Sequence, residues 1–133
     1  MWYKFLVGND KIISFYKKIP ELNNISIINI IFENNGTNIY IDFYMPYLPE
    51  LLLKAPPKEY NSIFVEIRLI GVKKIYMKTK GRFDNVNISI EPVGDNYNLK
   101  STICLFDFLI DFGFIFIICQ SCFSNFTGFS YFP

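Results

Sequence analysis

Apolar and polar residues alternate with a period of two along much of the chain. Residues 39–45 place aliphatic and Phe side chains on one face and Tyr40, Asp42 and Tyr44 on the other. Residues 63–69, 75–78 and 86–91 repeat this arrangement. Such a period is typical of strands with one face in a core, and short connections favour antiparallel pairing. The pattern predicts a mainly antiparallel β-sheet or sandwich whose core contains Ile41, Phe43, Val65, Ile67, Leu69, Ile88 and Ile90.

Turn-forming residues divide these strands. Asn34-Asn35-Gly36 predicts a hairpin turn, because these residues tolerate positive φ angles. Residues 92–96 predict a second turn, Gly71 a turn or bulge, and residues 111–113 a turn between two buried strands. Residues 46–60 contain four prolines, which cannot donate to a strand ladder, and are expected to form a surface loop. Residues 25–32 are apolar on both faces, which predicts a central strand.

A helical period occurs near the N-terminus. Ile12, Phe15, Tyr16 and Ile19 have the spacing of one helix face, after Asn9 or Asp10 as a cap, and Pro20 would end the helix. We therefore expect an amphipathic helix at about residues 9–19 that packs on the sheet. Together with the strands it predicts an α+β fold, and the length of 133 residues fits a single domain over residues 1–133.

Composition and charge indicate which classes of partner and which cellular compartment to expect. Apolar residues make up 51% of the chain and the net charge is +1, which argues against nucleic acid as the main partner. The most apolar segment, residues 103–119, contains Asp107 and Asp111, so a membrane span is not expected. The first ten residues lack the apolar run of a signal peptide, and we expect a cytoplasmic protein.

The residue types argue against catalysis. The chain has no histidine, which removes the usual general base, and its carboxylates are scattered singly. Cys119 and Cys122 have a CxxC spacing, but the following residues do not predict a helix, and the only further cysteine is Cys104. We expect reduced packing cysteines, no metal, no cofactor and no enzyme activity, although the spacing leaves a redox role of Cys119 and Cys122 open.

The polar sides of the strands form the best candidate site. Tyrosines, carboxylates and an arginine alternate away from the aliphatic face, a composition typical of protein-binding surfaces. The alternative is that the helix or a second sheet covers part of this face. The candidate partner-binding residues are Tyr40, Asp42, Tyr44, Glu66 and Tyr76.

Markers along nearly the whole chain resemble a known family. They are Met1-Trp2-Tyr3-x-Phe5, the segments 11–16 and 19–22, Met45-Pro46-x-x-Pro49, Pro56-Pro57-Lys58, residues 69–72 and Thr127-Gly128-Phe129. In order and spacing they are similar to the immunity protein 50 family of bacterial polymorphic-toxin systems. Asn23 and Asn24 depart from it, because a histidine or an acidic residue is expected there, and the C-terminal segment is unusually rich in Phe.

The resemblance implies a bacterial cytosolic protein that binds a cognate toxin and neutralises it without catalytic residues. Many toxins of such systems attack nucleic acids through basic clefts, which carboxylates and aromatics would complement. The alternatives are a β-barrel that carries a small apolar ligand, or a general protein-interaction module; the aromatic content favours the first of these. The oligomeric state and the identity of the toxin are not encoded in these patterns.

Overall fold

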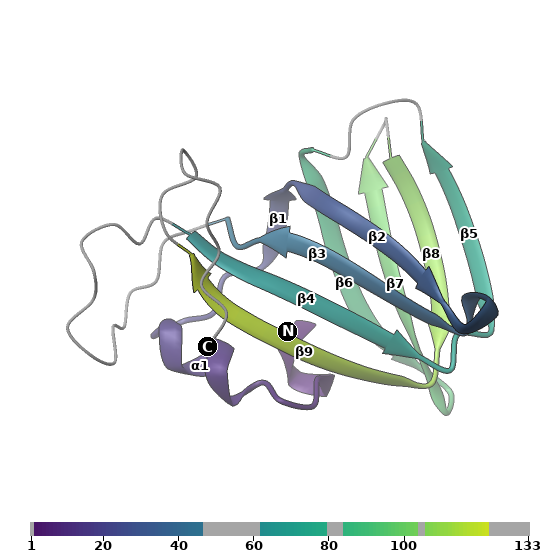
Figure 1. The fold of residues 1–133 in the computed structure, drawn as a ribbon, viewed down its shortest axis with the longest axis horizontal. Helices are drawn as coiled ribbons and strands as arrows, with labels where there is room; N and C mark the ends of the chain where they lie inside the picture. The colour runs from purple at the N-terminus through teal and green to yellow at the C-terminus, as the bar shows by residue number, and fades with distance from the viewer. Residues whose placement is uncertain (1, 47–61, 80–83, 104–105, 123–133) are drawn as a thin grey trace.

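Antiparallel strands dominate the computed structural model, which describes residues 2–46, 62–79, 84–103 and 106–122. The strands form two sheets, one with the order β1-β6-β7-β8-β5 and the other with the order β2-β3-β4-β9 (Figure 1). The strands are β1 (Leu22–Ile25), β2 (Ile27–Glu33), β3 (Asn38–Tyr44), β4 (Ser62–Ile70), β5 (Lys74–Thr79), β6 (Val86–Val93), β7 (Asn96–Ile103), β8 (Phe106–Phe112) and β9 (Phe114–Cys122). The expectation of an antiparallel sandwich is confirmed, whereas the loop predicted for residues 46–60 lies almost entirely outside the described residues.

The chain changes sheets at corners, where the strands of the two layers cross steeply (Figure 1). β4 leads into β5 and β8 into β9 at the same corner, where the Gly113 amide donates to the Ile70 carbonyl at 3.1 Å. A Cβ on Gly71 would lie 3.7 Å from the Gly113 backbone, and Gly71 has a φ of +69°. A Cβ would make only an ordinary van der Waals contact at that distance, so it is the left-handed backbone that favours glycine at this position. The predicted turn at Gly71 is confirmed, whereas the turn predicted for residues 111–113 is shorter than expected, because Asp111 and Phe112 belong to β8 and Gly113 alone connects it to β9.

The hairpin turns follow their local residues. Asn34, Asn35 and Gly36 all have positive φ and form the short 3-10 turn η2 (Asn34–Gly36) between β2 and β3. The second predicted turn is shorter than expected, because Pro92 and Val93 belong to β6, and only Gly94 and Asp95 connect it to β7.

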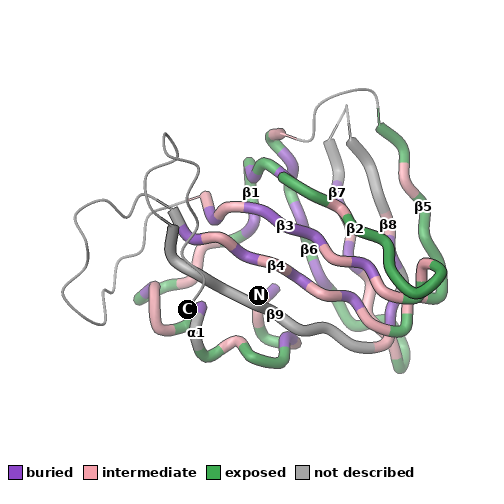
Figure 2. The backbone as a smooth tube through the Cα atoms, in the orientation of Figure 1, coloured by how far each residue is buried: buried purple, intermediate pink, exposed green. Residues whose placement is uncertain are grey.

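Side chains from both sheets meet in one hydrophobic cluster between them. Along β4, and along β3 except at the buried Asp42, the buried positions alternate with partly exposed ones (Figure 2). All the predicted core residues are buried, with exposed fractions between 0 and 6%. The cluster also contains side chains that precede the first strand, namely Trp2, Leu6, Ile12 and Tyr16.

The helix is shorter than its periodicity predicts. α1 spans Asp10–Phe15, and Tyr16 already has an extended backbone, with a φ of −131° and a ψ of 139°. Asn9 does not cap it through its side chain; the Asn9 side-chain amide donates to the Tyr3 carbonyl instead, at 3.1 Å. Tyr16 is nonetheless buried. Packing of this side chain therefore continues the apolar stripe after the helical backbone has ended, and Pro20 is not the residue that ends the helix.

The prediction of a central strand at residues 25–32 is wrong. Leu22–Ile25 forms an edge of one sheet and Ile27–Glu33 forms an edge of the other, with Ser26 at the change of sheet. On β2 the side chains of Ile28, Ile31 and Phe32 are 40–49% exposed. Much of β2 is accordingly exposed in Figure 2. An apolar segment without alternation does not by itself identify a central strand, because β2 carries these residues at an edge.

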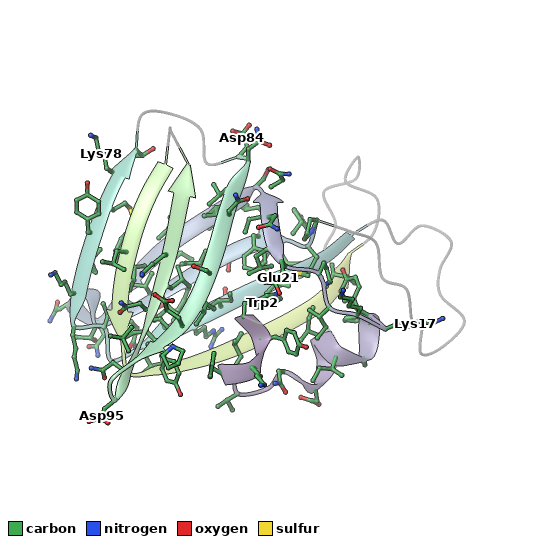
Figure 3. All side chains as sticks on the ribbon, turned by 180° about the vertical axis from the view of Figure 1, so that it is seen from behind. Trp2, Lys17, Glu21, Lys78, Asp84 and Asp95 are labelled. Carbon is green, nitrogen blue, oxygen red and sulfur yellow. The ribbon has the colours of Figure 1, made fainter. Side chains whose placement is uncertain are left out.

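Trp2 fixes the N-terminal segment to the sandwich. It lies in the 3-10 turn η1 (Trp2–Phe5), and its indole is 1% exposed and donates through Nε1 to the Pro20 carbonyl at 2.9 Å. In Figure 3 Trp2 lies close to Glu21, where the chain enters β1. The bond therefore ties the start of the chain to the segment that leads into the first strand.

Replacement of Trp2 by Phe is expected to lower the free energy of unfolding by about 1–3 kcal/mol, because the ring stays buried while the Pro20 carbonyl loses its donor. Urea denaturation followed by tyrosine fluorescence measures the change. A free energy equal to that of the parent protein would show that water replaces the indole without cost.

Candidate functional site

The outward side of the β2-β3-β4 sheet carries an acidic and aromatic surface. Register places Tyr40 opposite Arg68, Asp42 opposite Glu66, and Tyr44 opposite Phe64 on adjacent strands β3 and β4. These positions alternate with the buried core positions of the same strands, so their side chains lie on the other face of the sheet. Asn29 and Glu33 join them from β2, since Asn29 pairs with Asp42 and the Tyr40 hydroxyl donates to Glu33. We call this surface the β3–β4 face; its residues are Asn29, Glu33, Tyr40, Asp42, Tyr44, Phe64, Glu66 and Arg68.

Four of the five predicted site residues belong to this face, but Tyr76 does not. Tyr40, Asp42, Tyr44 and Glu66 come together as the alternation predicts. Tyr76 lies on β5, the edge strand of the other sheet, and is 50% exposed. The prediction of one shared face is therefore wrong for Tyr76, because period-two alternation assigns a side of its own strand and not the sheet to which the strand belongs.

Two residues of the face were missed because β2 was predicted to be a buried central strand. Asn29 and Glu33 lie at alternate positions with Ile31, on the outward side of β2. The signal was present in the polar identity of positions 29 and 33, but the irregular register between Ile27 and Asn29 obscured the alternation.

A network of polar contacts orders one half of the face. Arg68 donates through Nε to Glu66 Oε1 at 2.6 Å and lies over the Tyr40 ring, with its guanidinium carbon 4.8 Å from the ring centroid. The Tyr40 hydroxyl in turn donates to Glu33 Oε1 at 2.8 Å. Glu66 raises the pKa of the Arg68 guanidinium, and the bond to Glu33 raises the pKa of the Tyr40 hydroxyl. These groups hold each other in defined positions at the surface.

Asp42 is the unusual member of the face. Asp42 is only 5% exposed although its side chain points away from the core, because the neighbouring strands β2 and β4 flank it on both sides. Asn29 donates to Asp42 Oδ2 at 3.3 Å, while no donor among the described residues reaches the buried Oδ1. Burial, followed by the neighbouring Glu66, raises the pKa of the Asp42 carboxyl to about 6, against the smaller opposing effects of Asn29 and Arg68. The face therefore contains a carboxyl that exchanges its proton near neutral pH.

The other half of the face is aromatic. Tyr44 and Phe64 pack edge to face, with their ring centroids 5.8 Å apart and their planes at 71°. Tyr44 follows Asp42 along β3 and Phe64 precedes Glu66 along the antiparallel β4, so the carboxyl pair lies between the Tyr40–Arg68 pair and the Tyr44–Phe64 pair. Rigid aromatics beside charged groups are the composition that protein-binding surfaces favour.

The described residues were compared with the requirements of a metal site and of a membrane-spanning helix. They contain no group of three or more Cys, Asp or Glu side chains placed to hold a metal ion. Cys104 lies outside the described residues, and the side chains of Cys119 and Cys122 are not described, so the prediction about the cysteines stays a prediction. Within the same residues, no helix has the length and apolarity required to cross a bilayer.

Comparisons with known proteins identify the family. Neither the curated proteins nor the solved structures contain a match to this chain. A family model does match: that of Immunity protein 50, over residues 8–120, which include α1 and nearly all of the nine strands of the described residues. The matched segment contains the whole β3–β4 face and the corners that join the two sheets, so the chain belongs to the Immunity protein 50 family.

Proposed function

We propose that this protein is a bacterial, cytoplasmic immunity protein that binds the cognate toxin of a polymorphic-toxin system and neutralises it through the β3–β4 face, without catalysis. Membership of an immunity protein family supports the general function. The observation that points to this face is the carboxyl pair Asp42–Glu66, which lies between the Tyr40–Arg68 pair and the Tyr44–Phe64 pair on the outward side of a sheet. The carboxylates would steer a basic surface of the toxin into place, and the aromatic rings would supply much of the buried contact.

The position of the face agrees with a binding role. It belongs to the central strands β3 and β4, which are held by neighbours on both sides, so the contact residues are fixed before a partner arrives. The space between the two sheets, where a carrier would hold an apolar ligand, contains the packed side chains of the hydrophobic cluster in the described part of the chain. We therefore favour the outward face over the interior as the functional surface.

Replacement of Glu66 by Lys should weaken binding of the toxin at least about tenfold, because it reverses one charge at the centre of the face. Glu66 is a better position than Asp42, since the Glu66 side chain is 16% exposed and the new ammonium group would lie opposite Asp42. A lysine at position 42 would instead place a charge at a site that is only 5% exposed and would test folding rather than binding. The partner for this experiment is a toxin domain sought in the neighbouring reading frame, and binding is measured by calorimetry and by survival of co-expressing cells.

Glu91→Lys is the matched control. Glu91 lies on β6 of the other sheet, where it is exposed and forms an ion pair with Lys100, so the substitution makes the same change of charge away from the β3–β4 face. It should bind and protect like the parent. Equal binding by the Glu66→Lys variant would remove the β3–β4 face from the interface, and failure of the parent to bind the toxin would contradict the proposed function.

A further inference from the structure

The buried carboxyl of Asp42 has one oxygen that no described donor reaches, and it lies opposite a second carboxyl group. Its Oδ1 is buried and lacks a hydrogen-bond donor among the described residues, although most buried polar atoms have one. The carboxyl also lies directly opposite Glu66, and two like charges at opposed positions of adjacent strands destabilise a sheet. In the free protein the two opposed carboxyl groups are therefore held together by a proton on Asp42 and not by a cation between them.

The same face shows how it binds a guanidinium. Arg68 lies over the ring of Tyr40 and donates to Glu66, so an aromatic ring supports the planar cation and a carboxylate accepts its hydrogen bond. On the other side of the carboxyl pair, Tyr44 and Phe64 are again aromatic neighbours of a carboxyl group, in this case Asp42. The second half of the face therefore repeats the combination of an aromatic ring and a carboxyl group that supports Arg68 in the first half.

We propose, building on the proposed function, that an arginine side chain of the toxin binds across the Asp42–Glu66 pair, beside Tyr44 and Phe64, and that Asp42 gives up its proton when this arginine arrives. Glu66 is the carboxylate that the guanidinium reaches at the surface, because its side chain is 16% exposed. Asp42 lies beside it below the surface and contributes the second negative charge. The proton that Asp42 releases passes to the buffer, so one cation replaces one proton at the pair.

The charged groups around Asp42 determine the direction of the effect. Glu66 and Arg68 face it from β4, Asn29 contacts it from β2, and Glu33 lies farther along β2, bonded to Tyr40. Asp42 is the more deeply buried member of the pair and the one whose pKa is raised, so it holds the proton in the free protein below about pH 6. An arriving cation favours the ionised form and lowers the pKa of Asp42 in the complex.

Because toxin binding is linked to the loss of the Asp42 proton, its dependence on pH has a size that can be measured. Asp42 has a pKa of about 6 in the free protein, so at about pH 5 only about a tenth of the molecules carry the ionised form, whereas nearly all carry it at about pH 7.5. If the complex requires the ionised form, the affinity for the toxin should fall about tenfold between these two pH values. Binding near pH 6 should release about half a proton, which calorimetry in two buffers of different ionisation enthalpy detects.

The Asp42→Asn variant distinguishes the titration of Asp42 from that of other groups, including those of the toxin. Asparagine has nearly the same shape, keeps an oxygen to accept from Asn29, and stays neutral at every pH. In this variant the affinity at about pH 7.5 should fall at least about tenfold, and the Asp42 share of the pH dependence and of the proton release should disappear. Glu91→Gln, on the other sheet, should keep the behaviour of the parent.

Replacement of the toxin's arginines by alanine, one at a time, tests which toxin residue contacts Asp42. One of them should lose affinity with the parent protein and lose little further with the Asp42→Asn variant, as expected for two groups in contact. Tight binding whose pH dependence is the same with and without Asp42 would overturn this inference while leaving the proposed function intact. Coupling of Asp42 to a toxin lysine instead of an arginine would overturn the assignment of a guanidinium.

Discussion

Replacing Ile67 by alanine is expected to lower the free energy of unfolding by about 2–5 kcal/mol. Ile67 lies near the middle of β4, pairs with Ile41 on β3 and Ile117 on β9, and is 0% exposed. Neighbouring strands on both sides prevent the site from collapsing around the smaller side chain, so the loss includes a cavity as well as the buried methyl and methylene groups. Urea denaturation should show a lower midpoint with an unchanged slope.

Ile31→Ala is the matched control for this effect. The same atoms are removed on β2, but Ile31 is 40% exposed at the edge of the same sheet, so the expected loss is below about 1 kcal/mol. Equal midpoints for the two variants would mean that the inward and outward faces of β4 are assigned the wrong way round.

Asp42→Asn should stabilise the protein at about pH 8 by up to about 3 kcal/mol. The pKa of Asp42 is raised from 3.8 to about 6 on folding, so the folded protein holds this proton more tightly than the unfolded chain. The stabilisation from the protonated form is complete below about pH 3.8 and is lost as the pH rises through about 6. A shift of about two pKa units corresponds to about 3 kcal/mol of stability. The parent protein loses this stability when Asp42 ionises, whereas the asparagine variant, which stays uncharged, does not.

Urea denaturation of parent and variant at about pH 8 and about pH 4 measures this difference. The advantage of the asparagine variant should shrink towards zero at about pH 4, where both side chains are neutral. Glu91→Gln should show no comparable advantage, because Glu91 is exposed and paired with Lys100. An asparagine variant less stable than the parent at about pH 8 would show that the ionised carboxylate is well accommodated in the free protein. A gain in stability together with a loss of binding would instead mark Asp42 as a residue retained for recognition at a cost to the fold.

Within each strand, the sequence predicted the faces correctly. The period-two pattern on β3, β4 and β6 identified core residues such as Phe43, Val65 and Ile88, all of which are buried. It also placed Tyr40, Asp42, Tyr44 and Glu66 on the outward side. Alternation succeeds here because the backbone of a strand directs successive side chains to opposite sides wherever the strand lies. The turns at Asn34–Gly36 and Gly71 were predictable for a similar reason, since they depend on local positive φ angles that asparagine and glycine tolerate.

The neighbours of each strand were decided by the tertiary structure alone. β1 pairs with β6 and β4 pairs with β9, both far apart in the sequence, and no local pattern encodes these pairings. Their consequences are the edge position of β2, the separation of Tyr76 from the β3–β4 face, and the early end of α1 where Tyr16 enters the core. The burial of Asp42 has the same origin: its polarity and outward direction are local, but its exposure depends on Asn29 and Glu66 from the strands on either side. Periodicity thus determined which way each side chain points, whereas packing between distant segments decided what each side chain meets, because burial is a property of neighbours in space and not of neighbours in sequence.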